Sequence, residues 1–250
     1  MDAGAAHVDG GAMSLKNARV LIVGGTSGIG LGVASAVAER GGIPIVASRQ
    51  QASVDRALAT LPDGARGLTV DLTDTTALDR LVDEVGAIEH LVYTAGDALA
   101  LAPLSALTPE AINSFLLVRF VGALTAIKVF ASQITSGGSI TLTSGTAAER
   151  PGLGVLPTAV CGAVNAMTRA LALELAPLRV NTVAPGPIRT PLWDTLSETD
   201  RQAIYDQFAS QLPVGRIGEA GDTARAYVYL MEQEFGTGVV LTVDGGSTLS

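Results

Sequence analysis

Val20-Leu21-Ile22-Val23-Gly24-Gly25-Thr26-Ser27-Gly28-Ile29-Gly30 is the stretch that decides the fold. An apolar run of strand length enters a glycine-rich turn, and residues 31–40 follow with apolar residues at helical spacing. A strand, a glycine turn and a helix in this order are typical of a turn that binds phosphate. Gly24, Gly28 and Gly30 then provide the tight turn, the close approach of the backbone to a pyrophosphate and the close packing of helix on strand. The alternative is an ordinary connection between a strand and a helix.

The start of this helix offers unpaired N–H groups and the positive end of the helix dipole to an anion. Thr26, Ser27 and Ile29 stand between the glycines and are therefore candidate contacts of the same anion.

Composition limits the classes of protein that the chain can belong to. Its 250 residues are 48% hydrophobic and 16% charged, which predicts one α/β domain with a large core. The net charge of −8, without a basic cluster, argues against nucleic acid and anionic membrane surfaces as partners. The longest apolar stretch, residues 115–131, is interrupted by Arg119 and Lys128, so we do not expect it to span a membrane.

Cysteine and histidine are scarce. The single Cys161 excludes an intrachain disulfide and favours a cytoplasmic protein. His7 and His90, the only histidines, do not form a metal cluster with it, so no metal is expected. Residues 1–13 lack the features of a signal peptide and are expected to be a flexible tail, which leaves residues 14–250 as a single domain.

Strand and helix patterns alternate along the rest of the chain. The expected strands are 20–23, 43–47, 68–70, 88–93, 139–143, 180–183 and 238–243, and the expected helices include 52–61, 75–85, 108–132, 158–175 and 221–231. The strands are apolar runs without alternation, which indicates that both of their faces are covered. We therefore predict a Rossmann-type, doubly wound parallel sheet of about seven strands with helices on both faces and a ligand at the carboxyl ends of the strands.

From Arg19 to Ser247 the chain resembles the short-chain dehydrogenase/reductase family. Five segments carry the resemblance. In the order of the chain they are the cofactor-binding glycine turn, the segment that contacts adenine in the family, the end of the family's Asn-Asn-Ala-Gly motif, the segment beside the nicotinamide and the C-terminal signature. The corresponding residues are Gly24 to Gly30, Asp71-Leu72, Ala95-Gly96, Arg179 to Gly186 with Pro185, Ile188 and Thr190, and Val243 to Gly246. The resemblance implies a nicotinamide dinucleotide bound across the strand ends of a homotetramer or homodimer.

The chain departs from the family at the chemistry. The family uses a Tyr-x-x-x-Lys pair on one helix, and the matching positions here carry Pro157 and Cys161. The only lysines are Lys16 and Lys128. Simple explanations are that Pro157 starts the helix and that Cys161 is a small buried hydrophobe.

Arg49 follows the second strand, with Ser48 before it, where an acidic residue would accept the adenosine 2′-hydroxyl. An arginine there favours a 2′-phosphate and hence NADP(H) over NAD(H). A solvated loop arginine is the alternative.

Ser144 and Arg119 are the candidate catalytic residues. Ser144 stands where the family keeps its serine and is either a hydrogen-bond donor to a substrate oxygen or a satisfied hydroxyl at a strand end. Arg119 stands at the family's asparagine position and either reaches the space of the missing lysine or extends along the helix surface into solvent.

Residues 187–211, with Leu192, Trp193, Tyr205 and Phe208, are expected to form an amphipathic lid over an apolar substrate. Tyr205 is the one phenol that could swing toward the substrate, and a plain surface helix is the alternative. Apolar residues around much of the two long helices, such as Phe115, Leu124 and Met167, favour a homo-oligomer.

Three functions are consistent with these features. The first is an NADP(H)-dependent oxidoreductase acting on an apolar carbonyl or alcohol with a non-standard active site. The second is a cofactor-binding partner or regulatory subunit without catalysis, and the third is a non-redox enzyme that uses the same pocket.

Overall fold

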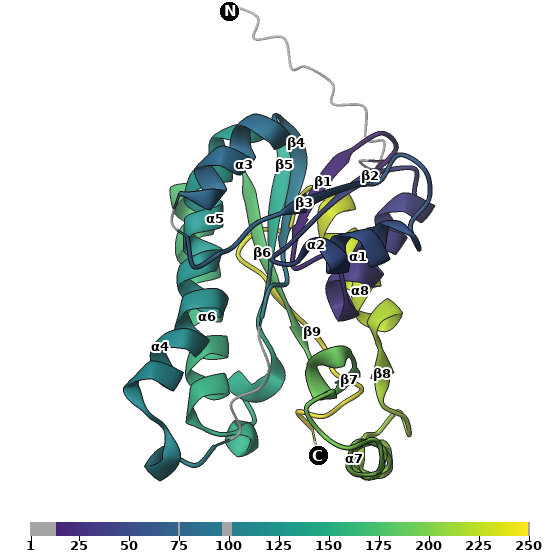
Figure 1. The fold of residues 1–250 in the computed structure, drawn as a ribbon, viewed down its shortest axis with the longest axis vertical. Helices are drawn as coiled ribbons and strands as arrows, with labels where there is room; N and C mark the ends of the chain where they lie inside the picture. The colour runs from purple at the N-terminus through teal and green to yellow at the C-terminus, as the bar shows by residue number, and fades with distance from the viewer. Residues whose placement is uncertain (1–13, 75, 97–101, 250) are drawn as a thin grey trace, which may run out of the picture.

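Seven parallel strands form the main sheet, in the order β3-β2-β1-β4-β5-β6-β9 (Figure 1). They are β1 Arg19–Val23, β2 Ile43–Ser48, β3 Arg66–Thr69, β4 Ile88–Tyr93, β5 Ile134–Thr143, β6 Arg179–Pro185 and β9 Val240–Val243. The computed structural model describes residues 14–74, 76–96 and 102–249, so the expected tail over residues 1–13 lies outside the described residues. The sheet confirms the predicted seven-stranded, doubly wound fold.

Helices cover both faces of this sheet, and β1 is apolar on both sides. Along β1, Val20 and Ile22 pack on one face, while Leu21 and Val23 pack on the other, and none of the four is more than 1% exposed. The first face is covered by α1 Gly28–Glu39, α2 Gln51–Leu58 and α8 Ala220–Glu232, and the second by α3 Ala77–Val85, α5 Gly122–Phe130 and α6 Val155–Glu174 (Figure 1).

The chain reverses its direction of travel across the sheet between β1 and β4, which are neighbours. The loops that follow these two strands meet there. Gly24 has a φ of +88°, and a Cβ built on it would lie 2.5 Å from the backbone nitrogen of Ala95. Only glycine fits this contact, so the glycine turn and residues 94–96 form one surface at the point where doubly wound sheets bind ligands.

The long helix predicted over 108–132 is interrupted. It begins as α4 Pro109–Leu116, with the Thr108 hydroxyl accepting from the Ala111 N–H at 3.2 Å, and then widens into the π-helical turn η2 Leu117–Val121 before α5. The Tyr93 hydroxyl donates to the Val118 carbonyl at 2.5 Å within this turn. A Cβ on Gly122 would lie 2.5 Å from the same hydroxyl oxygen, so the glycine makes room for the phenol. Arg119 therefore projects from an irregular turn, a type that is frequent at functional sites.

Most other element boundaries differ from prediction by one to five residues, and two of these differences matter for the sheet and the site. Strand β5 begins at Ile134 rather than at 139, because residues 134–138 pair irregularly with β4 around Gly137, whose φ is +84°, instead of forming a loop. Helix α6 begins at Val155 rather than at 158, so Pro157 lies inside its first turn, where a missing N–H costs nothing.

Residues 109–133 and 155–174 are long and apolar enough to cross a membrane by length and composition alone. Both pack on the same face of the sheet, which is the position of core helices in an α/β domain. Phe115 and Met167, expected to be available to a partner, are buried in this core, and Leu124 remains 37% exposed.

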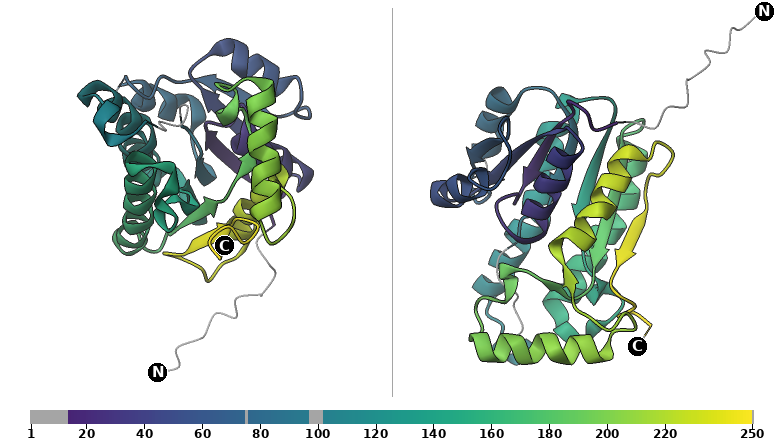
Figure 2. Two further views of the ribbon diagram at one scale, coloured as in Figure 1. Left: turned by 90° about the horizontal axis from the view of Figure 1, so that it is seen from below. Right: turned by 90° about the vertical axis from the view of Figure 1, so that its right-hand side faces the viewer.

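The predicted lid consists of β7 Ile188–Arg189, the short helix η6 Pro191–Trp193 and α7 Glu198–Gln211. Helix α7 lies across the end of the molecule to which the carboxyl ends of the strands point (Figure 2). Strand β7 pairs with β8 Gly218–Glu219 in a separate two-stranded sheet, which was not predicted.

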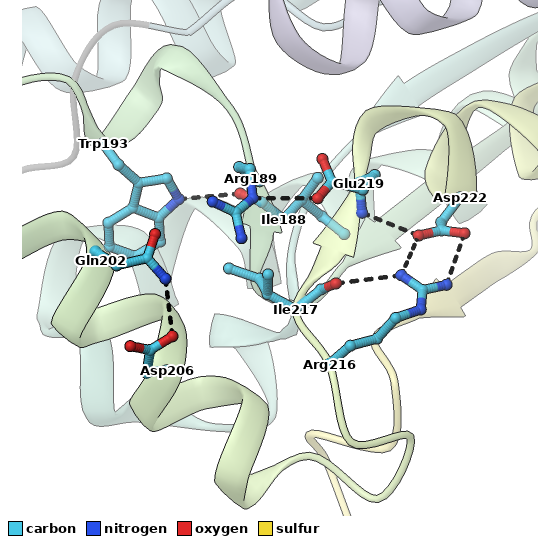
Figure 3. A network of polar contacts seen from close by, with 9 residues as sticks. All are labelled: Ile188, Arg189, Trp193, Gln202, Asp206, Arg216, Ile217, Glu219 and Asp222. Carbon is cyan, nitrogen blue, oxygen red and sulfur yellow. Dashed lines mark hydrogen bonds and ion pairs between the residues drawn. The ribbon is translucent and has the colours of Figure 1, made fainter. Parts of the chain in front are cut away.

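Polar contacts fasten the base of the lid to α8 (Figure 3). The Trp193 indole N–H donates to the Ile188 carbonyl at 3.0 Å, and Arg189 Nε lies 3.1 Å from Glu219 Oε1. Arg216 forms a bidentate ion pair with Asp222 at 2.6 and 3.0 Å. These contacts fix the two ends of the lid while its middle packs around Trp193.

Candidate cofactor and substrate site

Two adjoining cavities of about 580 and 570 Å³ open at the carboxyl ends of the strands. We call the first the lid-side cavity, because Leu192, Trp193 and Phe208 line it, and the second the turn-side cleft, because Gly24 and Thr26 line it. Both cavities are lined by Ser27, Thr94, Ala95, Gly96 and Pro191.

Every candidate site residue lines one or both of them. The turn-side cleft contains Gly24, Thr26, Ser27, Ser48, Arg49, Asp71, Leu72, Ala95 and Gly96. The lid-side cavity contains Ser27, Gly28, Ile29, Gly30, Ala95, Gly96, Arg119, Ser144, Pro185, Gly186, Ile188 and Thr190. The structure thus places together residues that are far apart in the sequence.

The glycine turn in the cleft is open to an anion. Ser27 is the N-cap of α1, and no side chain caps that helix. A Cβ on Gly30 would lie 2.2 Å from the Gly24 carbonyl oxygen, so the helix start packs against the strand end without room for a side chain. Thr94 Oγ1 lies 3.2 Å from the carbonyl oxygens of both Val23 and Gly24 and holds the turn in place. The exposed backbone N–H groups and the helix dipole suit a pyrophosphate.

The far end of the cleft carries positive charge. Arg49 lies there at the end of β2, and Arg56 of α2, which the sequence analysis did not identify, joins it. The Arg56 guanidinium donates to Ser53 Oγ at 2.9 Å. Hydrogen bonds from the Thr73 hydroxyl and N–H, at 2.7 and 2.9 Å, lower the pKa of Asp71, and the charge of Arg49 adds a smaller effect in the same direction.

Ser144 lies in the wall of the lid-side cavity at the end of β5. Its N–H donates to the Val183 carbonyl at 2.9 Å, which fixes the backbone. Its Oγ is buried and has no hydrogen-bond partner in the described part of the chain. The alternative of a satisfied strand-end hydroxyl is therefore not what the structure shows, and the hydroxyl is available to a bound molecule.

Arg119 points into the same cavity rather than along the helix surface. Its guanidinium carbon lies 4.6 Å above the centre of the Phe115 ring, and a Cβ on Gly96 would lie 2.3 Å from Nη1. The absence of a side chain at Gly96 thus makes room for the guanidinium at the junction of the two cavities.

Pro157 and Cys161 line the cavity on one face of α6. The Cys161 sulfur lies 3.3 Å from where a Cβ on Gly145 would stand, next to Ser144. Burial raises the pKa of the Cys161 thiol to about 11, although the positive charge of Arg119 acts in the opposite direction. The thiol is therefore neutral at pH 7.

The rest of the lining is mainly apolar, and no Lys, Tyr, His, Asp or Glu belongs to it among the described residues. Tyr205, the phenol expected to swing in from the lid, does not line the cavity. It is 4% exposed, meets Trp193 edge to face at 6.4 Å and lies beneath the Arg189 guanidinium at 4.3 Å. Burial raises its pKa, and the expectation that it is an available proton donor was wrong because its ring fills the core of the lid.

The sequence analysis did not single out Arg150, Ser247 and Gln211, which also line this cavity. The Arg150 Nη1 donates to the Ser247 carbonyl at 2.5 Å. The position of Arg150 in a loop after a strand was the only local signal, and none linked it to the C-terminal segment.

A parallel doubly wound sheet with a glycine turn at its switch point and an adjoining apolar cavity defines a dinucleotide-dependent enzyme class. A family profile described as Enoyl-(Acyl carrier protein) reductase matches residues 23–248. The short-chain dehydrogenase/reductase malC of Malbranchea aurantiaca is 34% identical, over 94% of this chain and 96% of that protein. The chain belongs to the short-chain dehydrogenase/reductase family of oxidoreductases.

Solved structures agree. The MalC reductase/Diels-Alderase has a TM-score of 0.86 at 34% identity and covers 94% of this chain and 98% of its own. A small-chain dehydrogenase in complex with NADPH has a TM-score of 0.78 at 30% identity, with 94% and 100% covered. A 3-ketoacyl-(acyl-carrier-protein) reductase from Brucella melitensis, complexed with NADH, has a TM-score of 0.84 at 27% identity, with 94% and 100% covered. The family therefore binds nicotinamide cofactors of both kinds.

Proposed function

We propose that this protein is an NADP(H)-dependent reductase or dehydrogenase of an apolar carbonyl or alcohol, with Ser144 and Arg119 in place of the usual catalytic pair. The observation that carries the proposal is the buried, unpartnered Ser144 hydroxyl in the same apolar cavity as the Arg119 guanidinium. When bound, the cofactor supplies or accepts the hydride.

The turn-side cleft suits NADP(H). The backbone of residues 27–30 would hold the pyrophosphate, and Arg49 with Arg56 would bind the adenosine 2′-phosphate. Pro185, Gly186, Ile188 and Thr190 line the lid-side cavity and would bind the nicotinamide.

Hydride addition to a carbonyl builds negative charge on its oxygen, which the site has to stabilise. The Ser144 hydroxyl donates a hydrogen bond to that oxygen, and the fixed charge of Arg119 strengthens the stabilisation in a mainly apolar cavity. A guanidinium stays protonated, so it does not deliver the proton. Water supplies the proton, and turnover of simple ketones is slow relative to enzymes with a phenolic acid, since general acid catalysis contributes about 10²–10⁴ in rate.

The test follows reduced-nicotinamide absorbance with NADPH or NADH and a panel of apolar ketones and aldehydes. We expect slow oxidation of NADPH that Ser144→Ala lowers by about 10²–10³, the effect of one oxyanion donor. Arg119→Met should lower it further while NADPH still binds. Oxidation that survives both substitutions contradicts the assignment of the site.

A second candidate is a non-redox reaction in the same cavity. No Tyr or Lys lines the cavity among the described residues, and a relative at 34% identity is described as a reductase/Diels-Alderase. An apolar cavity that holds two reacting groups close together accelerates their reaction without acid or base. Conversion of a substrate without any change in the cofactor's absorbance would favour this function.

We further propose that the protein forms a homo-oligomer through the outer faces of α5 and α6. Leu124 of α5 is 37% exposed, Val121 at the end of η2 just before it is 44% exposed, and Leu173 of α6 is 84% exposed. A second copy would remove this apolar surface from water. Light scattering of the wild type and of Leu173→Glu tests the proposal, and a monomeric wild type at micromolar concentration contradicts it.

A further inference from the structure

We infer that the lid-side cavity binds substrates that carry a carboxylate on an apolar body, and that Arg150 binds the carboxylate. The inference deepens the proposed function by naming the substrate class of the same cavity. It stands on the charge of the lining, on the way Arg150 is held and on the separation of Arg150 from the turn-side cleft.

The lining of the cavity has the opposite charge to the protein as a whole. Arg119 and Arg150 both belong to it, whereas no acidic side chain does among the residues that the structure describes. The whole chain carries a net charge of −8. Arg119 is partly buried and Arg150 is exposed at the rim of the cavity, and their two positive charges favour an anion over a neutral molecule of the same shape.

Two hydrogen bonds fix Arg150 at the wall of the cavity. Its backbone N–H donates to the Thr146 carbonyl at 2.8 Å, and its side-chain Nη1 donates to the carbonyl of Ser247, near the C-terminus, at 2.5 Å. Ser247 is 2% exposed, and its hydroxyl donates to Asp244 Oδ2 at 3.1 Å. Since a guanidinium has five N–H donors in a rigid fork, the bond to Ser247 orients it and leaves donors for a carboxylate.

The cofactor does not account for this arginine. Arg150 and Ser247 line the lid-side cavity alone, while Arg49 and Arg56 line the turn-side cleft. The proposed phosphate contacts all lie in the cleft or at the start of α1. Arg119, against Gly96, stands between the two regions. The reacting oxygen therefore belongs near Ser144 and Arg119, and the carboxylate near Arg150.

The intrinsic fluorescence of Trp193 provides the probe for the test. Trp193 is the only tryptophan, is 7% exposed and lines the cavity, so its fluorescence reports what binds there. The full chain is titrated, with and without NADP⁺, with 4-phenylbutanoate and decanoate and with the methyl ester and primary amide of each. Binding requires no turnover, so the result is independent of whether hydride transfer occurs, and NADP⁺ binding is measured separately by calorimetry.

We expect each acid to bind about tenfold to a hundredfold tighter than its ester and amide, the range of one charge-assisted hydrogen-bonded contact. Arg150→Gln should remove the preference, and Arg150→Lys should keep part of it. Arg40→Gln is the control, since it removes the same charge from an ion pair with Glu232 outside both cavities. Equal affinity for acids and esters in the wild type, or a preference that survives Arg150→Gln, overturns the inference.

Discussion

The turn-side cleft and the lid-side cavity share five lining residues, yet they are built differently. One wall of the cleft is largely backbone, since Gly24 allows the close approach of residues 94–96 and Ser27 begins a helix that no side chain caps. The cavity is a side-chain structure, in which Arg119 comes from η2, Ser144 and Arg150 from the connection between β5 and α6, and Trp193 from η6. Substitution of Gly24 should therefore act through conformation, whereas substitutions in the cavity, and of Arg49 in the cleft, should act through chemistry.

The largest expected effect comes from restoring a phenol and an ammonium group to the cavity. Pro157 and Cys161 lie one turn apart at the start of α6 and both line the cavity. Pro157→Tyr with Cys161→Lys should raise ketone reduction by about 10²–10⁴, because the lysine charge lowers the pKa of a phenol that then supplies the proton. Initial rates of NADPH oxidation measure the effect.

The single variants are the controls, and each should gain less than the pair. An unchanged rate in a double variant that folds and binds NADPH would show that proton supply does not limit the wild type.

Gly24→Val tests the conformational side of the comparison. The φ of +88° and the backbone of Ala95 at 2.5 Å from the added Cβ predict a loss of about 2–5 kcal/mol in the free energy of unfolding, together with loss of cofactor binding. Gly221→Ala in α8, where no atom lies within 4 Å of the added Cβ, should be neutral or slightly stabilising. Urea unfolding compares the two, and similar behaviour would contradict the described geometry.

Arg49→Ala should reduce the affinity for NADPH by about tenfold to a hundredfold and leave the affinity for NADH unchanged, since one charge-assisted contact to the 2′-phosphate is lost. Calorimetric titration of both cofactors measures this. Arg80→Ala, which breaks an exposed ion pair with Asp74 outside the cleft, is the matched control. A wild type without preference for NADPH would exclude the proposed cofactor.

Tyr93→Phe carries the smallest expected effect and connects the two regions. Loss of the hydrogen bond to the Val118 carbonyl should cost about 1 kcal/mol of stability and loosen the π-helical turn that carries Arg119. We therefore expect kcat to fall more than KM rises, with NADPH affinity unchanged. The control is Tyr229→Phe in α8, where the Tyr229 side chain is 55% exposed, and it should change neither kcat nor KM. Equal kinetics in the two variants would remove Tyr93 from the positioning of Arg119.

The sequence predicted those parts of the molecule that depend on short-range patterns. The glycine turn, the seven strands and the two-sided burial of β1 follow from neighbouring residues. All candidate catalytic and cofactor-binding residues except the lid phenol Tyr205 line one of the two cavities, because loops after parallel strands meet at one edge of the sheet.

Features that depend on contacts between residues far apart in the sequence were either not predicted or predicted wrongly. The π-helical turn depends on Tyr93, which lies 25 residues before its partner, and Arg150 is oriented by a residue 97 positions away. Tyr205 has the pattern of an accessible lid residue, yet its ring is buried between Trp193 and Arg189. None of these contacts leaves a periodic signal in the sequence.

The pairing of β7 with β8 also determines how easily the lid can change in length during evolution. Ile188 pairs with Gly218 and Arg189 with Glu219, so the segment between them leaves the domain and returns to it at almost the same place. Lengthening a loop whose ends are already joined costs little, since closure entropy grows only slowly with length. Insertions and deletions within residues 192–217 can thus alter the shape of the substrate cavity while the seven-stranded sheet, its glycine turn and Thr190 stay as they are.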